Sequence, residues 1–441
     1  MTTPQPQTAP LPSAGGTRLL AARQGIPPVP WSHAAGSWIH AADGRRFLDG
    51  ASGLVCVNIG HAHPVVTSAI ADQLARGTFA SPGTLTPRLQ TRLAETIAVA
   101  VGRPGDLVGL TTSGTSAVEL AIAIARSAQR ARGEEGRHGV LTASLGYHGN
   151  SAFALALSGH GRRRPHPDDG FGVAPAFDPP YPGLHAGCRF EVCRAECADA
   201  VEEAILTRGA NRVAAVLLEP VNGTTGGGYV PPAGYLAAVR AICDRHGVLL
   251  IYDEVLTGLG RTGLPLAADH EPASRPDIVV LAKGLAAGFV PLAAVLIAPE
   301  LGETVLSGGG PLPIMGTMSA TPLQARAGLA VLSVLGDIGA LDPTTPRGTA
   351  VDAAVRDAAE GSPLVLDVRG KGYFHGVELT EGTQPAVLAR ARAAGLLLYP
   401  FNGFRRDGTG EGVIVAPPLT ISHDENDFLR ASLRTALSAA A

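Results

Sequence analysis

Two apolar runs near the middle of the chain, each followed by a chemically reactive side chain, constrain the fold most strongly. The first run, 248–252, is followed by Asp253, and the second, 277–282, is followed by Lys283. Short apolar runs of this kind are typical of strands buried on both faces of a parallel sheet. Because the carboxyl ends of parallel strands meet at one edge, where ligands bind, we expect Asp253 and Lys283 to lie close together.

An acid and an amine at one sheet edge suit a particular cofactor chemistry. Pyridoxal phosphate forms a Schiff base with a lysine amine, and its ring nitrogen stays protonated beside an aspartate. The sequence contains only two lysines, Lys283 and Lys371. Arginine does not deprotonate to become a nucleophile, so the other basic residues are excluded. We therefore expect Lys283 to carry such a cofactor, with Lys371 as a second candidate.

Length, charge and cysteine content limit the class of protein. The chain has 441 residues and a net charge of -3, so it has room for more than one domain and no excess charge for nucleic acid or membrane lipid. We find no apolar run near about 18 residues and no signal peptide, and we expect a cytoplasmic protein. Five cysteines are few and odd in number, and the spacing of Cys188, Cys193 and Cys197 fits no common zinc pattern. We expect thiols in a reducing compartment and no bound metal.

The order of predicted elements indicates an α/β protein. From residue 138 onward, strand-like runs alternate with segments of helical periodicity, which is typical of a mostly parallel sheet covered by helices. After a break at 343–348, strand-like segments at 366–379 and 412–415 alternate with helical ones, which indicates a smaller α+β layer. We expect a disordered tail at 1–16, a large domain at 70–335, and a small domain formed by 17–69 with 336–441.

Small hydroxyl residues and a glycine begin the helix that starts near residue 113. Ser113, Gly114 and Thr115 would serve as a plain helix cap. They also offer free N–H groups, hydroxyls and the positive end of the helix dipole, which a phosphate group requires. The motif alone leaves both interpretations open.

Three further motifs flank predicted strands and helices. Tyr147 and His148 lie between two glycines, where an aromatic ring either packs in the core or stacks on a flat ligand. Glu219 follows a strand-like run at 213–218. His61 and His63 precede a predicted helix at 64–77, and we expect them to cap the loop that enters this helix rather than to bind a metal.

Together, the order and spacing of these motifs resemble the class III, or omega, aminotransferases, which are fold-type I pyridoxal phosphate enzymes. The resemblance covers about 38–418. It implies a large domain with a mostly parallel seven-stranded sheet and a smaller α+β domain. Its most specific parts are Leu218-Glu219-Pro220-Val221, the run from Tyr252-Asp253-Glu254-Val255 to Arg261-Thr262-Gly263, and Leu281-Ala282-Lys283-Gly284.

The resemblance implies a role for each matching residue. Lys283 would bind the cofactor and then act as the base that moves the substrate proton, while Asp253 would pair with the ring nitrogen. The ring would lie between Val255 and Tyr147. A phosphate contact lent by a neighbouring subunit would make the protein a homodimer with shared sites. The remaining implied cofactor contacts are Ser113, Gly114, Thr115, His148, Glu219 and, from the neighbouring subunit, Thr317.

The substrate side of the site is less well determined by the sequence. Within the family, 53–58 and 415–421 look most like omega-transaminases that act on pyruvate and amines. In these enzymes an arginine before the Pro-Pro pair swings in to bind the substrate carboxylate. Arg405 or Arg406 occupies that region, with an ordinary surface charge as the alternative. Val55, which replaces a common aromatic, and Met318 suggest an altered substrate pocket.

The expected activity is transfer of an amino group between an amine or amino acid and a keto acid by a ping-pong mechanism. The alternative is a repurposed enzyme of natural-product biosynthesis that performs other carbanion chemistry. This could be carbon–carbon bond formation, beta- or gamma-elimination or replacement, epimerisation or decarboxylation, because the cofactor stabilises a carbanion at Cα in each case. A non-catalytic binding module is disfavoured by the intact Lys283 and Asp253. The sequence identifies neither the donor, the acceptor nor the stereochemistry.

Overall fold

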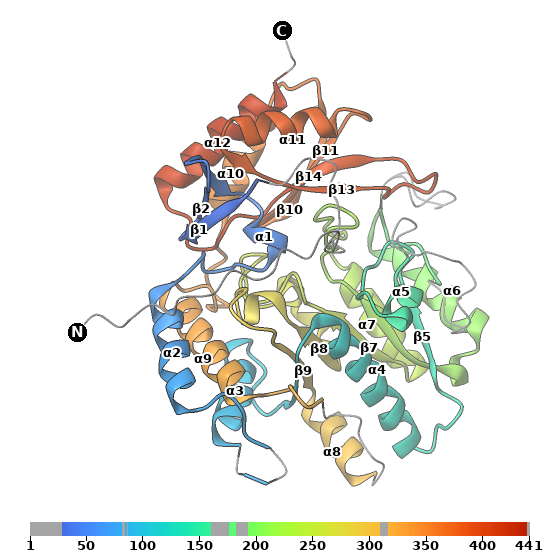
Figure 1. The fold of residues 1–441 in the computed structure, drawn as a ribbon. Coiled ribbons are helices and arrows are strands. Elements are labelled where there is room, and N and C mark those ends of the chain that lie inside the picture. Colours follow the sequence, from blue (N-terminus) through green and yellow to red (C-terminus); the bar gives the residue numbers. More distant parts are fainter. Residues whose placement is uncertain are drawn as a thin grey trace, which may run out of the picture.

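The computed structural model describes residues 29–81, 84–85, 87–159, 176–181, 193–308 and 316–438. The predicted tail at 1–16 and Cys188 lie outside these residues. A central sheet flanked by helices forms the lower part of the molecule in Figure 1, and a smaller layer of C-terminal strands and helices lies above it. None of the helices in the described part is long and apolar enough to cross a membrane.

The central sheet has six strands in the order β4-β9-β8-β7-β6-β5. Strands β5 to β8 are parallel to one another, and β9 is antiparallel to both of its neighbours, β8 and β4. The expected mostly parallel α/β sheet is therefore present. Its strands are β4 (Leu107–Thr111), β5 (Gly139–Thr142), β6 (Val213–Leu218), β7 (Leu249–Asp253), β8 (Ile278–Leu281) and β9 (Ala293–Ile297).

The expectation of seven strands is wrong for the described part of the chain. Beside the edge strand β5 lies a single parallel bridge between Ala143 and Phe177. Pro179 and Pro180 follow this bridge, and proline has no N–H group to donate to a strand ladder. Among residues 176–181, one bridge therefore occupies the position of a seventh strand.

Helices cover both faces of this sheet. Ile251 of β7 packs in one core cluster with α4 and α8, whereas Leu250 and Tyr252 pack in another cluster with α7. This alternation follows from the two-residue period of a strand. The helices before the C-terminal layer are α2 (Pro64–Arg76), α3 (Arg88–Ala100), α4 (Gly114–Ala131), α5 (Ala152–Leu157), α6 (Asp199–Arg208), α7 (Tyr235–His246), α8 (Pro299–Ser307) and α9 (Pro322–Asp337).

The C-terminal layer is built around a sheet with the order β10-β11-β14-β13. The strand-like segment at 366–379 forms the two strands of a hairpin, and Gly372 turns the chain between them with a φ of +65°. The elements are β10 (Val365–Lys371), β11 (Phe374–Leu379), β13 (Tyr399–Asn402) and β14 (Glu411–Val415), with α10 (Thr349–Ala359), α11 (Gln384–Ala393) and α12 (His423–Leu437).

The N-terminal strands join this C-terminal layer rather than the central sheet. β1 (Trp31–Ala35), β2 (Trp38–Ala41) and β3 (Arg46–Asp49) pair in order as an antiparallel sheet. β12 (Leu396–Leu397) then pairs with β3 in parallel. This pairing supports the proposed small domain formed by 17–69 with 336–441. Short helical turns complete the fold at α1 (Ser52–Val55), η1 (Ala195–Ala198), η2 (Ala210–Arg212), η3 (Ala267–His270), η4 (Pro272–Ser274) and η5 (Lys283–Leu285).

The β10–β11 hairpin lies directly against loops that leave the central sheet. A Cβ atom added at Gly376 would lie 1.9 Å from the carbonyl oxygen of Gly227, and one added at Gly372 would lie 2.3 Å from the carbonyl carbon of Thr262. Backbone atoms cannot rotate away as side chains can. Glycine is therefore required for this close contact between the two layers.

We expect Gly376→Ala to lower the free energy of unfolding by about 3 kcal/mol, because the added methyl group forces the Gly227 loop away. The control is Gly336→Ala, in the last turns of α9, where an added Cβ meets no atom within 4 Å. This variant should be neutral or stabilised by up to about 1 kcal/mol, since alanine favours the helix. Urea unfolding of both proteins measures the difference. Equal stability of the two variants would contradict the tight packing.

Candidate active site

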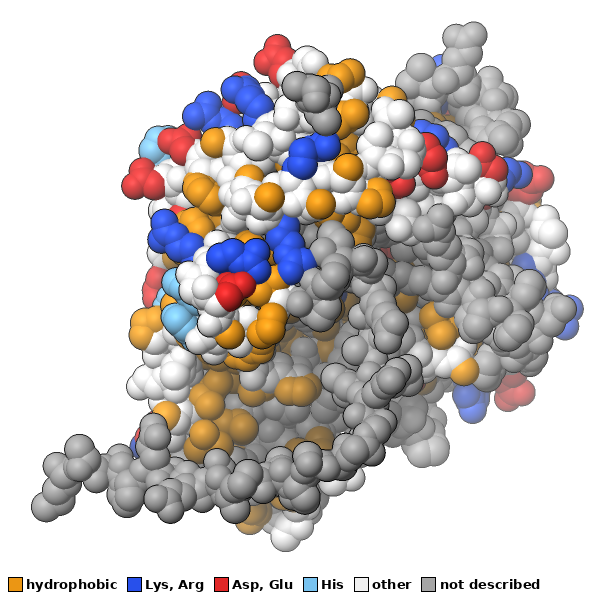
Figure 2. All heavy atoms as spheres, turned by 45° about the horizontal axis from the view of Figure 1, so that its top comes forward, with side chains coloured by type: hydrophobic (Ala, Val, Ile, Leu, Met, Phe, Trp, Pro, Cys, Tyr) orange, Lys and Arg blue, Asp and Glu red, His pale blue; other side chains and the backbone are white. Residues whose placement is uncertain are grey.

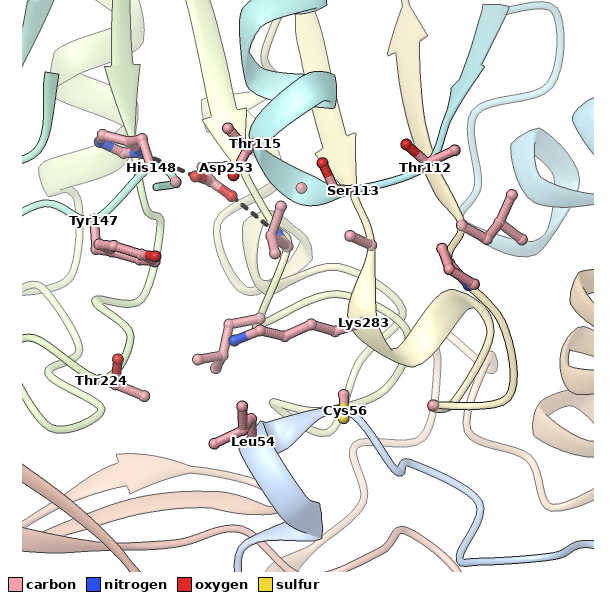
Figure 3. Close-up of a pocket in the computed structure, with 18 of the residues that line it drawn as sticks. Leu54, Cys56, Thr112, Ser113, Thr115, Tyr147, His148, Thr224, Asp253 and Lys283 are labelled. Carbon is pink, nitrogen blue, oxygen red and sulfur yellow. Dashed lines mark hydrogen bonds and ion pairs between the residues drawn. The ribbon is translucent and has the colours of Figure 1, made fainter. Parts of the chain in front are cut away.

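A pocket of about 390 Å³ lies at the carboxyl edge of the central sheet. Three of its lining side chains, Glu219, Asp253 and Lys283, stand at or directly after the ends of β6, β7 and β8. The strand order explains this gathering, because parallel strands direct their carboxyl ends to one edge. Figure 3 shows the Lys283 side chain extending across the pocket, with Asp253 farther back beside the start of α4.

Lys283 has an unusual backbone conformation. Its φ is +41°, and Ala287 a turn later has a φ of +46°. Such angles are unfavourable for residues other than glycine and persist only where the surroundings enforce them. The N–H of Leu285 donates to the carbonyl of Ala282 at 2.8 Å, which closes the turn around Lys283. The turn delivers the lysine side chain into the pocket directly from the end of the strand.

The Asp253 carboxylate is held from two sides. One oxygen lies 2.8 Å from Nδ1 of His148, and the other accepts the N–H of Val255 at 3.1 Å. His148 is itself buried, and its backbone N–H donates to Ser158 Oγ at 2.9 Å. Asp253 is only 5% exposed, so its charge acts in a medium of low dielectric. An orientated, buried carboxylate of this kind is able to hold a proton on a basic ring nitrogen.

Glu219 is a second, partly buried acid of the pocket. Its oxygens accept the N–H groups of Tyr147 at 3.2 Å and Gly223 at 3.0 Å, and the Nδ2 amide of Asn222 at 3.1 Å. Burial raises the pKa of Glu219 to about 7, and the nearby charge of Asp253 acts in the same direction. The two acids of the pocket therefore differ in their contacts: Asp253 is held by His148 and Val255, and Glu219 by Tyr147, Gly223 and Asn222.

The first turn of α4 faces the same pocket. Ser113 is the N-cap residue, and its Oγ accepts the N–H of Ser116 at 3.1 Å, so the capping interpretation is confirmed. The phosphate interpretation is compatible with it, because the first N–H groups of a helix have no carbonyl partner within the helix. Gly114 and Thr115 line the pocket. A Cβ atom at Gly114 would lie 3.0 Å from Val255, so only glycine leaves this end of the helix open.

These residues fit the phosphorylated aromatic aldehyde that the sequence predicts. A helix start able to bind a phosphate, the Asp253 carboxylate and the Lys283 amine line one cavity. Tyr147 and Val255 line it as well and offer two surfaces for a flat ring. His148 also lines the pocket, behind Asp253.

The residues expected on the substrate side lie elsewhere in this chain. Val55 is buried in the core with Phe401 and does not line the pocket. Its neighbours Leu54 and Cys56 line the pocket instead. The positive φ values of Ser52, Gly53 and Val55 break the simple alternation along this segment. No sequence pattern indicates this turn, and none indicates that Thr224 and Tyr399 also line the cavity.

The other residues expected to bind the substrate or to complete the partner's site do not line this pocket. They are Arg405, Arg406, Thr317 and Met318. Arg405 pairs with Glu378, and Arg406 pairs with Asp178. Thr317 and Met318 are exposed.

The histidine and cysteine motifs have structural surroundings. His61 Nε2 lies 2.8 Å from Asp49 Oδ2, and His63 occupies the N-cap position of α2 without a side-chain cap bond. His63 therefore ends the loop that enters α2, and both histidines lie in structural surroundings rather than in a metal site among the described residues. Cys197 accepts the N–H of Arg194 at 3.4 Å. Within the described ranges, no three His, Cys, Asp or Glu side chains are grouped to hold a metal ion.

Comparisons with known proteins agree with this geometry. A family model described as aminotransferase class III matches residues 20–437. The omega-aminotransferase of Caulobacter vibrioides is 32% identical over 92% of this chain and 92% of its own length. The 5-aminovalerate aminotransferase DavT of Pseudomonas putida is 34% identical over 85% of this chain and 86% of its own. Among solved structures, an amine transaminase from an uncultivated Pseudomonas species, in its pyridoxal phosphate-bound form, has a TM-score of 0.84 and 30% identity, and the match covers 97% of this chain and 99% of the other. The chain belongs to the class III aminotransferase family, whose members transfer amino groups with pyridoxal phosphate.

Proposed function

We propose that this aminotransferase moves an amino group between an amine or amino acid and a keto acid by a ping-pong route through the one pocket, with Lys283 as its catalytic residue. The observation that carries this proposal is the shared pocket of Lys283, Asp253 and the start of α4. The other carbanion reactions are not favoured, because the similar proteins named above are aminotransferases.

Each polar group of the pocket has a distinct task in this proposal. The bound cofactor supplies a ring that withdraws electrons from the substrate Cα. Asp253, held by His148, keeps the proton on the ring nitrogen. Lys283 would hold the cofactor through its amine and would serve as the base that takes the proton from the substrate Cα. Tyr147 and Val255 keep the ring flat between them, and the N–H groups and hydroxyls of residues 113–115 bind the phosphate.

A test of the reaction class needs no knowledge of the natural substrate. The loaded enzyme is mixed with a series of amino donors in the absence of any keto acceptor. Transamination by a ping-pong route releases one equivalent of keto product per site and then stops until acceptor is added. Incorporation of solvent deuterium into a donor with no keto product would instead favour the other carbanion chemistry.

The proposal includes a homodimer with shared sites, in which the partner's Thr317 completes the phosphate site. Thr317 is exposed, and Met318 beside it is 58% exposed although it is a large apolar residue. Leu54 lines the pocket and is also 58% exposed. Hydrophobic side chains are exposed on the face that Figure 2 shows. A second copy of the chain would cover such residues.

Cys56 and Cys243 are free thiols, which supports the proposed cytoplasmic location.

We expect Lys283→Ala to lower turnover by about 1,000-fold or more, because both the covalent attachment and the proton transfer are lost. The matched control is Lys371→Ala, the only other lysine substitution the chain allows. This control should retain activity. Borohydride reduction of the loaded parent followed by peptide mass analysis should place the cofactor on Lys283. Labelling of Lys371 would contradict the assignment.

Glu219 should make the stability of the cofactor-free protein depend on pH. Its folded pKa of about 7 lies above the ordinary value of 4.5, so the folded chain binds more protons than the unfolded chain between these values. The free energy of unfolding then falls as the pH rises through this range, by up to about 3 kcal/mol in total. Glu219→Gln removes this part of the fall. We expect the parent to lose more stability than the variant in urea unfolding between pH 5 and pH 8. Glu254, whose pKa is also raised to about 7, is present in both proteins and cancels. Parallel pH curves would contradict the expectation.

Arg405 should be the residue that recognises a substrate carboxylate. Among the described lining residues the pocket has no arginine, so a carboxylate partner has to move in from outside. Arg405 follows Phe404, which packs in one cluster with the pocket residue Leu256. We expect Arg405→Ala to raise the KM of a keto acid at least about tenfold, as the loss of a charged hydrogen bond does, and to leave the KM of an amine without a carboxylate unchanged. Arg406→Ala, at the neighbouring position, is the control. A larger rise in the KM of the keto acid for Arg406→Ala than for Arg405→Ala would assign carboxylate recognition to Arg406 instead.

A further inference from the structure

Arg261 is a buried cation for which the reaction described above provides no role. It belongs to the Arg261-Thr262-Gly263 motif and follows β7 by less than ten residues. Its side chain is fully buried, with 0% exposed, and no carboxylate of the described residues forms an ion pair or hydrogen bond with it. Burial lowers the pKa of Arg261 to about 10, so it remains charged at neutral pH. The buried Asp49 carboxylate acts on Arg261 only at a distance. A buried charge without a direct ion pair is costly and needs a physical explanation.

The guanidinium group of Arg261 joins three segments that are distant in the sequence. Nη1 donates to the carbonyl oxygens of Pro417 at 2.6 Å and Tyr373 at 3.4 Å. Nη2 donates to Oδ1 of Asn58 at 2.7 Å and to Oγ of Ser52 at 3.3 Å. Only a planar group with several N–H donors reaches acceptors in such different directions, which a lysine ammonium on its flexible stem does not.

The Asn58 partner connects Arg261 to the lysine turn. Asn58 is 1% exposed, and its Nδ2 donates to the carbonyl of Leu259 at 3.4 Å, so both ends of its amide are occupied. A Cβ atom at Gly284 would lie 2.3 Å from this Nδ2. The amide of Asn58 therefore lies directly against the residue that follows Lys283. Because Lys283 has a positive φ, a fixed neighbour on this side helps to maintain its turn.

The Ser52 partner connects Arg261 to the opposite wall of the pocket. Ser52 Oγ donates to the carbonyl of Ala416 at 2.7 Å and accepts from Arg261. Ser52 begins the segment that carries Leu54 and Cys56. Figure 3 shows these two residues across the pocket from Asp253, with the Lys283 side chain between the two sides. The guanidinium group of Arg261 thus contacts Asn58, which lies against the lysine turn, and Ser52, which begins the wall that faces it.

We propose that Arg261 is a positioning residue of the active site, which holds Asn58 against Gly284 and Ser52 in place beneath Leu54 and Cys56, and so fixes Lys283 relative to the facing wall of the pocket. The inference rests on Lys283 as the cofactor lysine. Neutral acceptors suit this role, because two of the four that Arg261 uses in the described part of the chain, Asn58 Oδ1 and Ser52 Oγ, belong to the segment that contacts the lysine turn and forms the facing wall.

The test compares Arg261→Lys and Asn58→Ala with a buried arginine outside the pocket. Arg103 is the control, because it is 3% exposed, pairs with Asp106 at 2.5 Å and does not line the pocket. All three variants are purified with bound pyridoxal phosphate. The readouts are the thermal midpoint, kcat and KM with one amine and pyruvate, and the visible circular dichroism per bound cofactor. The last readout reports how the cofactor is held and does not depend on turnover.

We expect Arg261→Lys and Asn58→Ala to lower kcat by about ten- to a hundredfold with little change in KM, because a small displacement of a catalytic group has effects of this size. The visible circular dichroism per cofactor should fall at least about twofold. The double variant should lose no more than Arg261→Lys alone, since both residues act through one contact. Arg103→Lys should lower the thermal midpoint but keep the kcat and circular dichroism of the parent.

The proposal is overturned if Arg261→Lys and Asn58→Ala only destabilise the protein, as Arg103→Lys does, or if their effects on kcat multiply in the double variant. If Arg261→Lys does not fold, Asn58→Ala carries the same test alone, because it removes the contact with Gly284 and leaves Arg261 in place. Borohydride labelling of Lys283 in the parent is done first. A failure of the lysine assignment is thereby separated from a failure of the positioning role.

Discussion

The register of three parallel strands is the constraint on which the pocket depends. Leu218 of β6 is paired with Tyr252 of β7, and Asp253 is paired with Val280 of β8. Neighbouring strands lie about 4.8 Å apart, so the residues that follow these pairs emerge within a few ångströms of each other. A shift of one residue in either ladder would turn Asp253 to the other face of the sheet. The fully buried, apolar strands specify this register and thereby bring Glu219, Asp253 and Lys283 to one edge.

The same register places a second buried acid where it stabilises structure. Glu254 follows Asp253 and points to the other side, where its oxygens accept the N–H groups of Ala267 at 3.0 Å and Ala268 at 2.9 Å. Asp253 and Val255 line the pocket, as alternation along an extended chain requires. One short motif therefore supplies the pocket and also fixes the loop that leads to β8. The price of burying several ionisable groups near one edge is a lower free energy of unfolding, which the large two-sided core offsets.

The sequence was informative where strands carry the site and uninformative where loops do. The buried strands, the lysine count and the start of α4 are local features, so the gathering of Asp253, Lys283 and Gly114 could be predicted. Leu54, Cys56 and Tyr399 reach the pocket through a turn with positive φ and through pairing with distant strands, and no local pattern encodes either. Within the described residues the expected seventh strand is represented only by the bridge between Ala143 and Phe177, which no sequence pattern distinguishes from a full strand. Gly372 marks the turn of the β10–β11 hairpin in the sequence, but its close contact with Thr262 comes from the packing of the two layers, which no local pattern encodes.

The two sides of the pocket are built from different kinds of element, which affects substrate choice under the proposed function. The cofactor side of the pocket is built on rigid strands and α4, whereas the facing wall comes from the short segment of Leu54 and Cys56 and from Tyr399. Arg405 lies outside, paired with Glu378, which is also paired with Arg369. Arg369 is enclosed by the rings of Tyr181, Phe401 and Phe404, so Glu378 stays in place while the partly exposed Arg405 can leave. Arg405 is 35% exposed in this pair and Glu378 only 11%, so the arginine is the partner that can move, and a substrate carboxylate in the pocket would compete for the same guanidinium. A substrate without a carboxylate leaves the pair intact, so one pocket is able to serve both halves of the proposed reaction.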